Sequence, residues 1–193
     1  MKDVSLHGTE PPSEWVKRWA HLVAPLGRVL DVACGHGRHA HYFYDKNHPV
    51  TLVDRAQEAI ESIAIPSHAC EKVVADIENG PWPFTGQQFD AVVVTNYLWR
   101  PLMPTLLASL APGGVLIYET FAQGNETVGK PSRPDFLLRS GELLETFKDL
   151  RAVAFEDGFI AGADGQTPRF VQRIAAVREA RVDQLPARYP LPS

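Results

Sequence analysis

A short apolar strand, a glycine-containing loop and a helix follow one another without interruption near the start of the chain. The strand is expected at Arg28–Val32, the loop at Ala33–Gly37 and the helix at Arg38–Tyr44. A strand that passes through a tight turn into a helix is the β-α unit of sheets whose strands run parallel. This feature restricts the fold most, because units of this kind in series build an α/β sheet.

The same unit recurs through the first two thirds of the sequence. Apolar runs predict further strands at Val50–Asp54, Lys72–Asp76, Phe89–Thr95 and Val115–Tyr118. Helical spacing of apolar residues predicts helices at 56–63 and 104–110, the second with Pro104 in its first turn. The unbroken valines at 92–94 indicate a strand that is buried on both faces, as central parallel strands are.

The last third of the chain departs from this alternation. After the stretch 121–140, which contains glycines and prolines, we expect a helix at Glu142–Phe147 with Ser140 as its N-cap. Two strands are then expected, near Arg151–Phe155 and near Arg169–Val177. No helix fits between them, so they predict an antiparallel β-hairpin.

We expect these elements to form one α/β domain that covers residues 1–193. Its centre should be a doubly wound, seven-stranded sheet, mostly parallel, with a C-terminal antiparallel β-hairpin. An N-terminal helix at about 13–24 is expected before the sheet, and an extended, proline-containing tail at 184–193 after it.

The composition is that of a globular protein without a global attraction for phosphate backbones. Apolar residues make up 45% of the chain, and 19 Lys and Arg against 23 Asp and Glu give a net charge of −4. We therefore expect a small-molecule partner and no nucleic acid. Two cysteines, no apolar leader and no run of about 18 apolar residues predict a cytoplasmic protein without membrane contact. A monomer or a homodimer is expected.

Acidic residues stand at the ends of three successive strands. They are Asp31, Asp54 and Asp76, and ligands of open α/β sheets bind beyond these carboxyl ends. The loop at 35–40 has the dinucleotide-binding pattern GxGxxA, with Asp54 placed for a ribose, so an NAD-dependent dehydrogenase is one interpretation. However, Asp31 at the mouth of the first strand would repel a pyrophosphate and attract an ammonium group. S-adenosylmethionine, which has an ammonium, a carboxylate and a ribose but no phosphate, fits this loop better.

The order of the motifs carries a family resemblance. The stretch VLDVACGHG resembles the first motif of class I S-adenosylmethionine-dependent methyltransferases, and LVD, VVADI, FDAVVVTNYLW and LAPGGVLIYET resemble their following motifs. The resemblance covers residues 27–121 closely and implies a Rossmann-like sheet. The wording ACGHGR is also similar to small bacterial methyltransferases of the tellurite-resistance type. One departure is Ala33, where the family often has glycine.

The resemblance also implies which residues contact the cofactor. It implies that the methionine end is lined by Asp31, Ala33, Gly35 and Gly37, that Asp54 binds the ribose, that Asp76 and Ile77 flank the adenine, and that Asn96, Tyr97 and Leu98 border the methyl group. We add His36 and Arg55 to the expected cofactor contacts.

Some of these residues have structural interpretations as well. Asp54 can cap the following helix, and Asp76 can open a turn. Cys34 is interpreted as a small residue that fits the loop. His36, His39 and His41 would point in different directions around the helix, so we predict no zinc site.

The acceptor is expected beyond the fourth and fifth strands. We predict substrate contacts from Tyr97, Arg100, Tyr118 and Phe121, and we interpret residues 121–140 as a lid or acceptor-binding segment rather than a mere connection. Candidate general bases are Tyr97, Tyr118, Glu119 and His36, and no catalytic residue is assigned. The resulting hypothesis is methyl transfer from S-adenosylmethionine to a small nucleophile. The alternatives are a cofactor-binding sensor or partner subunit without catalysis, and the dehydrogenase.

Overall fold

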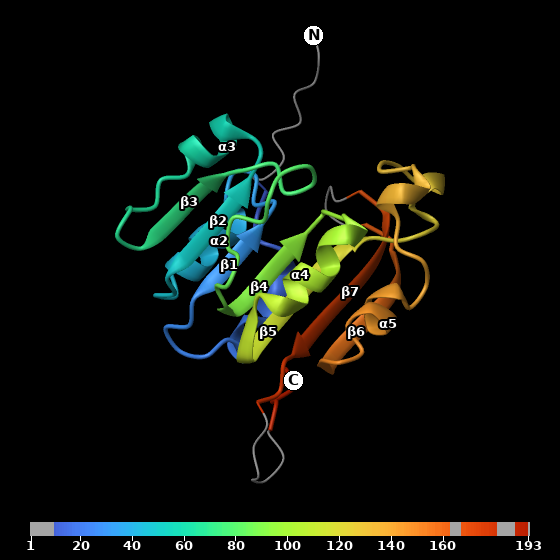
Figure 1. Cartoon of the computed structure of the whole chain (residues 1–193). Coiled ribbons are helices and arrows are strands. Elements are labelled where there is room, and N and C mark those ends of the chain that lie inside the picture. Colours follow the sequence, from blue (N-terminus) through green and yellow to red (C-terminus); the bar gives the residue numbers. More distant parts are fainter. Residues whose placement is uncertain (1–9, 163–166, 181–187, 193) are drawn as a thin grey trace.

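A mixed sheet of seven strands forms the centre of the structure (Figure 1). The computed structural model describes residues 10–162, 167–180 and 188–192. The strands are β1 (Val29–Val32), β2 (Val50–Asp54), β3 (Cys70–Val74), β4 (Phe89–Thr95), β5 (Leu110–Phe121), β6 (Arg151–Ile160) and β7 (Arg169–Val177). Their order is β3-β2-β1-β4-β5-β7-β6, with parallel pairing from β3 to β5 and antiparallel pairing of β7 with β5 and β6. The predicted doubly wound sheet with its C-terminal hairpin is confirmed.

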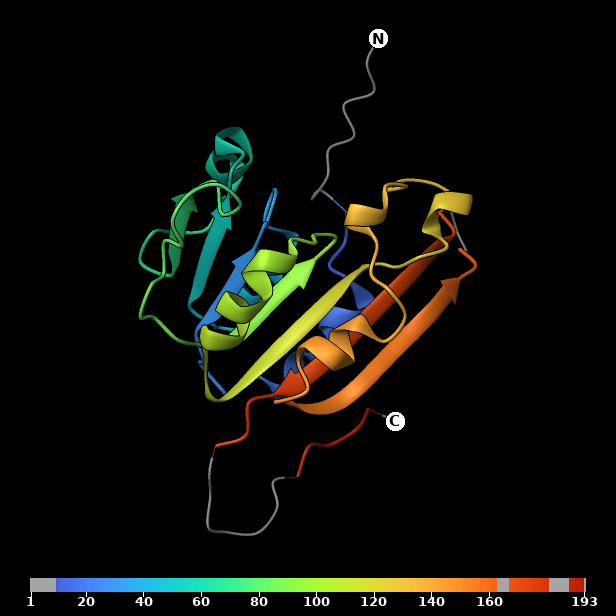
Figure 2. The same cartoon turned by 45° about the vertical axis from the view of Figure 1, so that its right-hand side comes forward.

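Helices cover both faces of this sheet (Figure 2). They are α1 (Glu14–Trp19), α2 (Arg38–Tyr44), α3 (Gln57–Ser62), α4 (Met103–Ala108) and α5 (Glu142–Thr146), with short 3-10 helices η1 (Ala20–Leu22), η2 (Arg100–Leu102), η3 (Asn125–Thr127) and η4 (Pro134–Phe136). Side chains of α1, α2 and α3, such as Trp15 and Phe43, form one core cluster with the sheet. Leu106 of α4 and Leu143 of α5 belong to a second cluster on the opposite face.

The central strand β4 shows why the valine run predicts burial on both faces. Val93 belongs to the cluster under α1 and α2, whereas Val92 and Val94 belong to the cluster under α4 and α5. All three side chains are fully buried. The apolar area that they remove from water on both sides favours a central position in the sheet.

The N-terminal helix begins directly after a capping serine. The Ser13 hydroxyl accepts a hydrogen bond from the Trp15 amide at 3.1 Å, which satisfies one free N–H group of the first turn. Trp15, Val16 and Trp19 are buried, and the helix continues through η1 to Leu22. The apolar side of α1 therefore packs against the sheet.

Several element boundaries differ from the predicted ones. β3 lies two residues earlier, so that Asp76 stands beyond the strand rather than at its last position. β5 begins at Leu110 rather than Val115, and its pairing with β4 shifts register between Phe89 and Ala91. β6 continues past Phe155 to Ile160. The expected role of Ser140 as N-cap is wrong, because its hydroxyl donates instead to the Asp157 carboxylate at 3.0 Å. Gly141, with φ of +72°, precedes α5 in its place.

Part of the predicted tail returns to the body of the protein. Residues 184–187 and 193 lie outside the described residues, but 188–192 are described and form no helix or strand. The ring of His21 lies 2.9 Å from the Pro190 carbonyl oxygen, and the Arg151 guanidinium lies over the ring of Tyr189. Among the described residues, no helix combines the length and apolar character that crossing a membrane requires.

Candidate functional site

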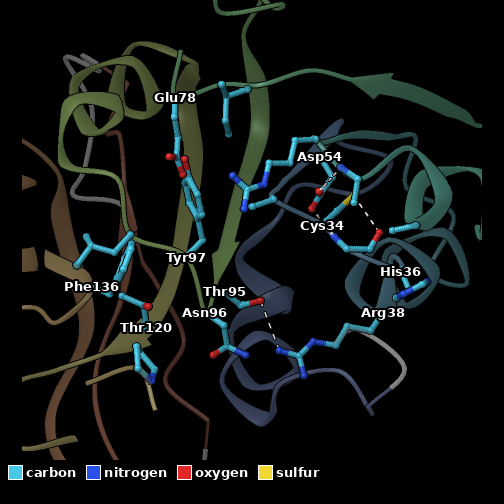
Figure 3. A pocket seen from close by; sticks show the side chains of 18 of the residues that line it. Cys34, His36, Arg38, Asp54, Glu78, Thr95, Asn96, Tyr97, Thr120 and Phe136 are labelled. Carbon is cyan, nitrogen blue, oxygen red and sulfur yellow. Dashed lines mark hydrogen bonds between the residues drawn. The ribbon is translucent and has the colours of Figure 1, made fainter. Parts of the chain in front are cut away.

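A cavity of about 750 Å³ opens at the carboxyl ends of β1, β2 and β4 (Figure 3). Most of the residues that the sequence predicts as cofactor contacts line it: Ala33, Gly35, His36, Asp54, Arg55, Asp76, Ile77, Asn96, Tyr97 and Leu98. Asp31 and Gly37 do not line it. The far wall comes from Phe121 at the end of β5 and from Lys130, Pro131 and Phe136 in the segment after it.

The loop after β1 is bent by three residues in the left-handed region. Ala33, Gly35 and Gly37 have φ of +53°, +54° and +74°. A side chain at Gly37 would also place its Cβ 2.7 Å from Cδ1 of Ile63, so glycine allows the loop to lie against the end of α3. Ala33 holds a conformation that costs a non-glycine residue about 1 kcal/mol or more, which explains why glycine is common at this position in the family that the sequence resembles.

Asp54 supports this loop and faces the cavity. One carboxylate oxygen accepts the Gly35 amide at 2.9 Å, and the other accepts the Ala56 amide at 2.8 Å. Each oxygen retains acceptor capacity for a ligand hydroxyl. The expectation that Asp54 caps α3 is wrong, because the residue at the N-cap position is Ala56 and the helix has no side-chain cap. Asp54 instead closes a turn just before the helix.

Asp76 combines both interpretations considered for it. Its carboxylate accepts hydrogen bonds from the Glu78 amide at 3.0 Å and from the Asn79 amide at 3.1 Å. The Asn79 side-chain amide donates a further hydrogen bond at 2.9 Å. This last bond, followed by the two from the backbone, lowers the pKa of Asp76. The residue is therefore a turn former that also lines the cavity beside Ile77.

Asp31 lies below the loop rather than at its mouth. Its side chain is 1% exposed, and one carboxylate oxygen has no hydrogen-bond partner among the described residues. Burial raises the pKa of Asp31 to about 7, although Arg38 and the Ala40 amide oppose this shift. The predicted position at the strand mouth is thus corrected: Asp31 is covered by the first turn of α2.

Arg38 lines the cavity, and the sequence interpretation did not include it among the site residues. Its guanidinium donates to Glu10 at 3.0 Å and to the Thr95 hydroxyl at 3.5 Å. A signal was present in the sequence, since a cation in the first turn of a helix is unfavourable for the helix dipole. Such local conflicts concentrate at functional sites.

Side chains of other elements form hydrogen bonds with residues 10–13 beside the cavity. The Ser13 amide donates to Nε2 of His39 at 3.1 Å, and the Ser13 hydroxyl donates to Glu119 at 2.8 Å. His39 is buried, and burial lowers its pKa to about 3, with a smaller contribution from Arg38. The ring is therefore neutral near pH 7, which leaves Nε2 able to accept the Ser13 amide.

The loop after β4 forms the middle of the cavity. Asn96 adopts φ of +54°, and Tyr97 follows with a buried hydroxyl that has no partner in the described part of the chain. Burial, together with the neighbouring Glu78 carboxylate, raises the pKa of Tyr97. The Tyr118 hydroxyl donates to the Tyr97 carbonyl oxygen at 2.9 Å, which fixes this loop to β5.

Two of the predicted substrate residues, Arg100 and Tyr118, do not line the cavity. The Arg100 guanidinium pairs with Glu142 at 2.6 Å and donates to the carbonyl oxygens of Asp135 and Leu137, both at 2.9 Å. Arg100 therefore holds the backbone on either side of Phe136. The structure supports a positioning role for Arg100 and Tyr118, whereas Tyr97 and Phe121 do line the cavity.

Of the candidate general bases, His36 has one ring nitrogen engaged, and Glu119 and the two tyrosines are paired or unsuited to accept a proton. Nδ1 of His36 lies 2.9 Å from the Ser62 hydroxyl, and Glu119 is buried in a pair with Arg173 at 3.0 Å. Burial raises the pKa of Tyr118 and also that of the Cys34 thiol, which stays protonated. Within the described ranges, no three His, Cys, Asp or Glu side chains are grouped for a metal ion.

Comparison with known proteins agrees with this arrangement. A family model described as "Methyltransferase domain" matches residues 29–114, from the start of β1 into β5. The match supports the class I S-adenosylmethionine-dependent methyltransferase family that the sequence motifs imply. The resemblance carried by VLDVACGHG and the motifs after it is thereby confirmed.

Individual relatives of this chain are distant. Malonyl-[acyl-carrier protein] O-methyltransferase of Serratia marcescens is 29% identical over 107 residues, which are 52% of this chain and 41% of that protein. The structure of TehB from Haemophilus influenzae superposes with a TM-score of 0.69 at 20% identity, over 89% of this chain and 63% of that one. The glycopeptide N-methyltransferase MtfA, complexed with S-adenosyl-L-methionine, gives a TM-score of 0.61 at 17% identity, over 92% and 98%. The chain therefore spans less than two thirds of the first two proteins.

Proposed function

We propose that this protein transfers the methyl group of S-adenosylmethionine to a small-molecule acceptor. The observation that carries the proposal is the position of Asp54, which lies at the end of β2 and faces the cavity. Both of its oxygens are oriented by backbone amides and can still accept a hydroxyl. This arrangement suits a ribose, whose two hydroxyl groups need a firmly placed acceptor.

The other residues of the cavity fit the same cofactor. Its volume of about 750 Å³ lies in the range of small-molecule sites. We assign Ala33, Gly35 and His36 to the methionine end, Asp54 and Arg55 to the ribose, Asp76 and Ile77 to the adenine, and Asn96, Tyr97 and Leu98 to the neighbourhood of the methyl group. Asp31 and Gly37 do not line the cavity, and we assign them to the shape of the loop at 33–37.

The bound cofactor would supply a methyl group on a sulfonium, which is already a good leaving group. The task of the protein is then to align donor and acceptor and to exclude water. We assign the acceptor to the space between the loop after β4 and the segment 121–138, with Tyr97 and Phe121 in contact with it. The net charge of −4 favours a small molecule over a nucleic acid.

The organisation around this site remains a set of predictions. We propose that residues 1–193 form a single domain, that residues 121–140 act as an acceptor-binding lid, and that the protein is cytoplasmic, as a monomer or homodimer. The N-terminal segment at 10–13 would form the border opposite the lid, because Glu10 also lines the cavity.

Calorimetry with S-adenosylmethionine tests the cofactor assignment. Asp54→Ala should weaken binding by about 100-fold, because a hydrogen bond to a charged group contributes roughly 1.5–3 kcal/mol. Asp149→Ala, at an exposed acid that does not line the cavity, is the matched control. Circular dichroism should show both variants folded, and unchanged affinity of the Asp54 variant would overturn the ribose assignment.

Two further measurements separate the alternatives. Formation of S-adenosylhomocysteine with any member of a metabolite panel distinguishes an enzyme from a sensor or partner subunit without catalysis. Thermal unfolding with S-adenosylhomocysteine or with NAD distinguishes the methyltransferase from a dehydrogenase, since a ligand stabilises the folded protein that binds it. Stabilisation by NAD alone would refute the proposal.

A further inference from the structure

The half of the cavity assigned to the acceptor differs in charge from the half assigned to the cofactor. We call it the acceptor compartment and define it by Thr95, Asn96, Thr120, Phe121, Lys130 and Phe136. None of these six residues is acidic. Asp54 ends β2 and Asp76 follows β3 on the cofactor side, whereas Glu78 lies beside Tyr97 (Figure 3).

Two cations line the cavity at this compartment. Arg38 reaches it from the start of α2, where its guanidinium lies within 3.5 Å of the Thr95 hydroxyl. Lys130 reaches it from the segment after β5 and forms no ion pair within the described part of the chain. The only acid beside them, among the described cavity residues, is Glu10, and its carboxylate is paired with Arg38 at 3.0 Å.

No side chain in the described part of this compartment is free to remove a proton from an acceptor. His36 lies on the other side of the cavity, beside Cys34 and Asp54 and away from Thr120 and Phe136 (Figure 3). Glu119, at the end of β5, is buried against Arg173 and Ser13 instead. A nucleophile that arrives protonated would therefore find no general base, whereas an ionised nucleophile would need none.

We propose that the methyl acceptor is a small anion, a carboxylate or a thiolate, which is held by Lys130 and Arg38 and methylated without proton removal by the protein. This inference rests on the proposed methyltransferase function. A lone pair of the anionic oxygen or sulfur forms the new bond to the methyl carbon. The bond between that carbon and the cofactor sulfur breaks, and its electron pair stays on the cofactor sulfur. One positive and one negative charge disappear together, and no proton moves.

The apolar walls of the compartment favour such a reaction. Phe136 is 42% exposed although it is a large apolar side chain, and Phe121 and Pro131 lie on the same wall. These groups can contact an apolar body of the acceptor and exclude water around its charged end. With water excluded, the attraction between the anion and the two cations is stronger than in bulk solvent.

The test uses the full-length protein, S-adenosylmethionine and a panel of small carboxylic acids, thiols, amines and neutral alcohols. Formation of S-adenosylhomocysteine is expected with acids or thiols and not with amines or alcohols, and the two anionic arms identify which nucleophile is used. Lys130→Met should raise the KM of the anionic acceptor by roughly two- to fivefold, the value of one exposed ion pair. The affinity for S-adenosylmethionine should stay the same. Lys148→Met, at an exposed lysine after α5, is the matched control.

A second variant examines the remaining acid. Glu10→Gln removes a negative charge next to Arg38 and should therefore lower the KM of the anionic acceptor. A hundredfold fall in kcat would instead identify Glu10 as a proton acceptor and overturn the inference. Turnover of amines alone, or an unchanged KM in Lys130→Met, would overturn it while leaving the proposed function intact. Failure of the wild-type protein to bind S-adenosylmethionine, or binding without turnover of any class, would overturn the proposed function and this inference with it.

Discussion

Replacement of Arg100 by leucine should destabilise the fold and distort the wall of the cavity at the same time. The guanidinium makes a two-pronged pair with Glu142, at 2.6 and 3.0 Å, and donates to the carbonyl oxygens of Asp135 and Leu137. The Glu142 side chain is only 4% exposed. Arg100→Leu therefore leaves a buried carboxylate without its main partner.

The magnitude follows from what remains around Glu142. Removal of one member of a buried pair typically costs about 3–5 kcal/mol. Here Arg100 is 37% exposed, and Glu142 keeps the Arg139 amide at 2.8 Å, so both features reduce the loss. We expect the free energy of unfolding to fall by about 2–3 kcal/mol in Arg100→Leu. Arg100→Lys keeps the charge but loses the paired geometry, so about half of that loss is expected.

Urea unfolding followed by tryptophan fluorescence measures this loss, and a double-mutant cycle with Glu142→Gln isolates the pair. A coupling free energy of about 1 kcal/mol or more is expected. Burial alone would raise the pKa of Glu142, but the hydrogen bonds from Arg100 and Arg139 outweigh it and leave the pKa lowered. This stabilisation is therefore present above the ordinary glutamate pKa of about 4.3 and is lost as the pH falls through the lower folded value. Additive effects in the cycle, or a loss under about 0.5 kcal/mol, would refute the reasoning.

Two other perturbations, at Asp31 and Ala33, test the end of β1 and the loop that follows it. The raised pKa of Asp31, about 7, means that its stabilising contribution is complete below its ordinary pKa of about 3.9 and is lost as the pH rises through 7. Between about pH 5 and 7 the wild type should lose about 2 kcal/mol that Asp31→Asn keeps, and parallel urea titration curves of the two proteins would contradict the assignment. Ala33 has φ of +53°. The free energy of unfolding of Ala33→Val should therefore be about 1–2 kcal/mol lower than that of the wild type, whereas that of Ala33→Gly should stay within about 1 kcal/mol of it. Thermal unfolding decides this, and equal stability of the valine and glycine variants would disprove the strain.

The parts of the molecule that the sequence predicts well are those with local signals. Apolar runs, glycine turns and helical spacing each involve neighbours in the chain, and together they predict the sheet and the loop at 33–37. The far walls of the cavity depend on contacts of another kind. Arg38 meets Glu10 across 28 positions, and Ser13 meets Glu119 across 106. No periodicity or turn signal specifies such pairs, so Glu10 and Arg38 were not predicted as cavity residues, although Phe121 and the segment 121–140 were.

The error in the placement of Asp31 has a similar physical origin. In a strand with one exposed face, alternation of apolar and polar residues shows which side chains point inward. All four residues of β1, VLDV, are buried. The strand therefore has no alternation that shows which side chains share a face. The sequence therefore indicates that Asp31 lies near the loop but not which face of the sheet it occupies, and the face under α2 removes it from the cavity.

Asp54, Tyr118 and Arg100 share one property that neither a catalytic nor a purely structural interpretation describes. Each binds the backbone of a loop that lines the cavity: Asp54 holds the Gly35 amide, Tyr118 the Tyr97 carbonyl, and Arg100 two carbonyls beside Phe136. The shape of the site thus depends on side-chain hydrogen bonds in places where no regular secondary structure supplies them. Substitution at these positions should therefore change stability and ligand affinity together. Substitution at Lys130, which holds no loop in the described structure, should change acceptor affinity alone, and this contrast separates residues that build the site from residues that use it.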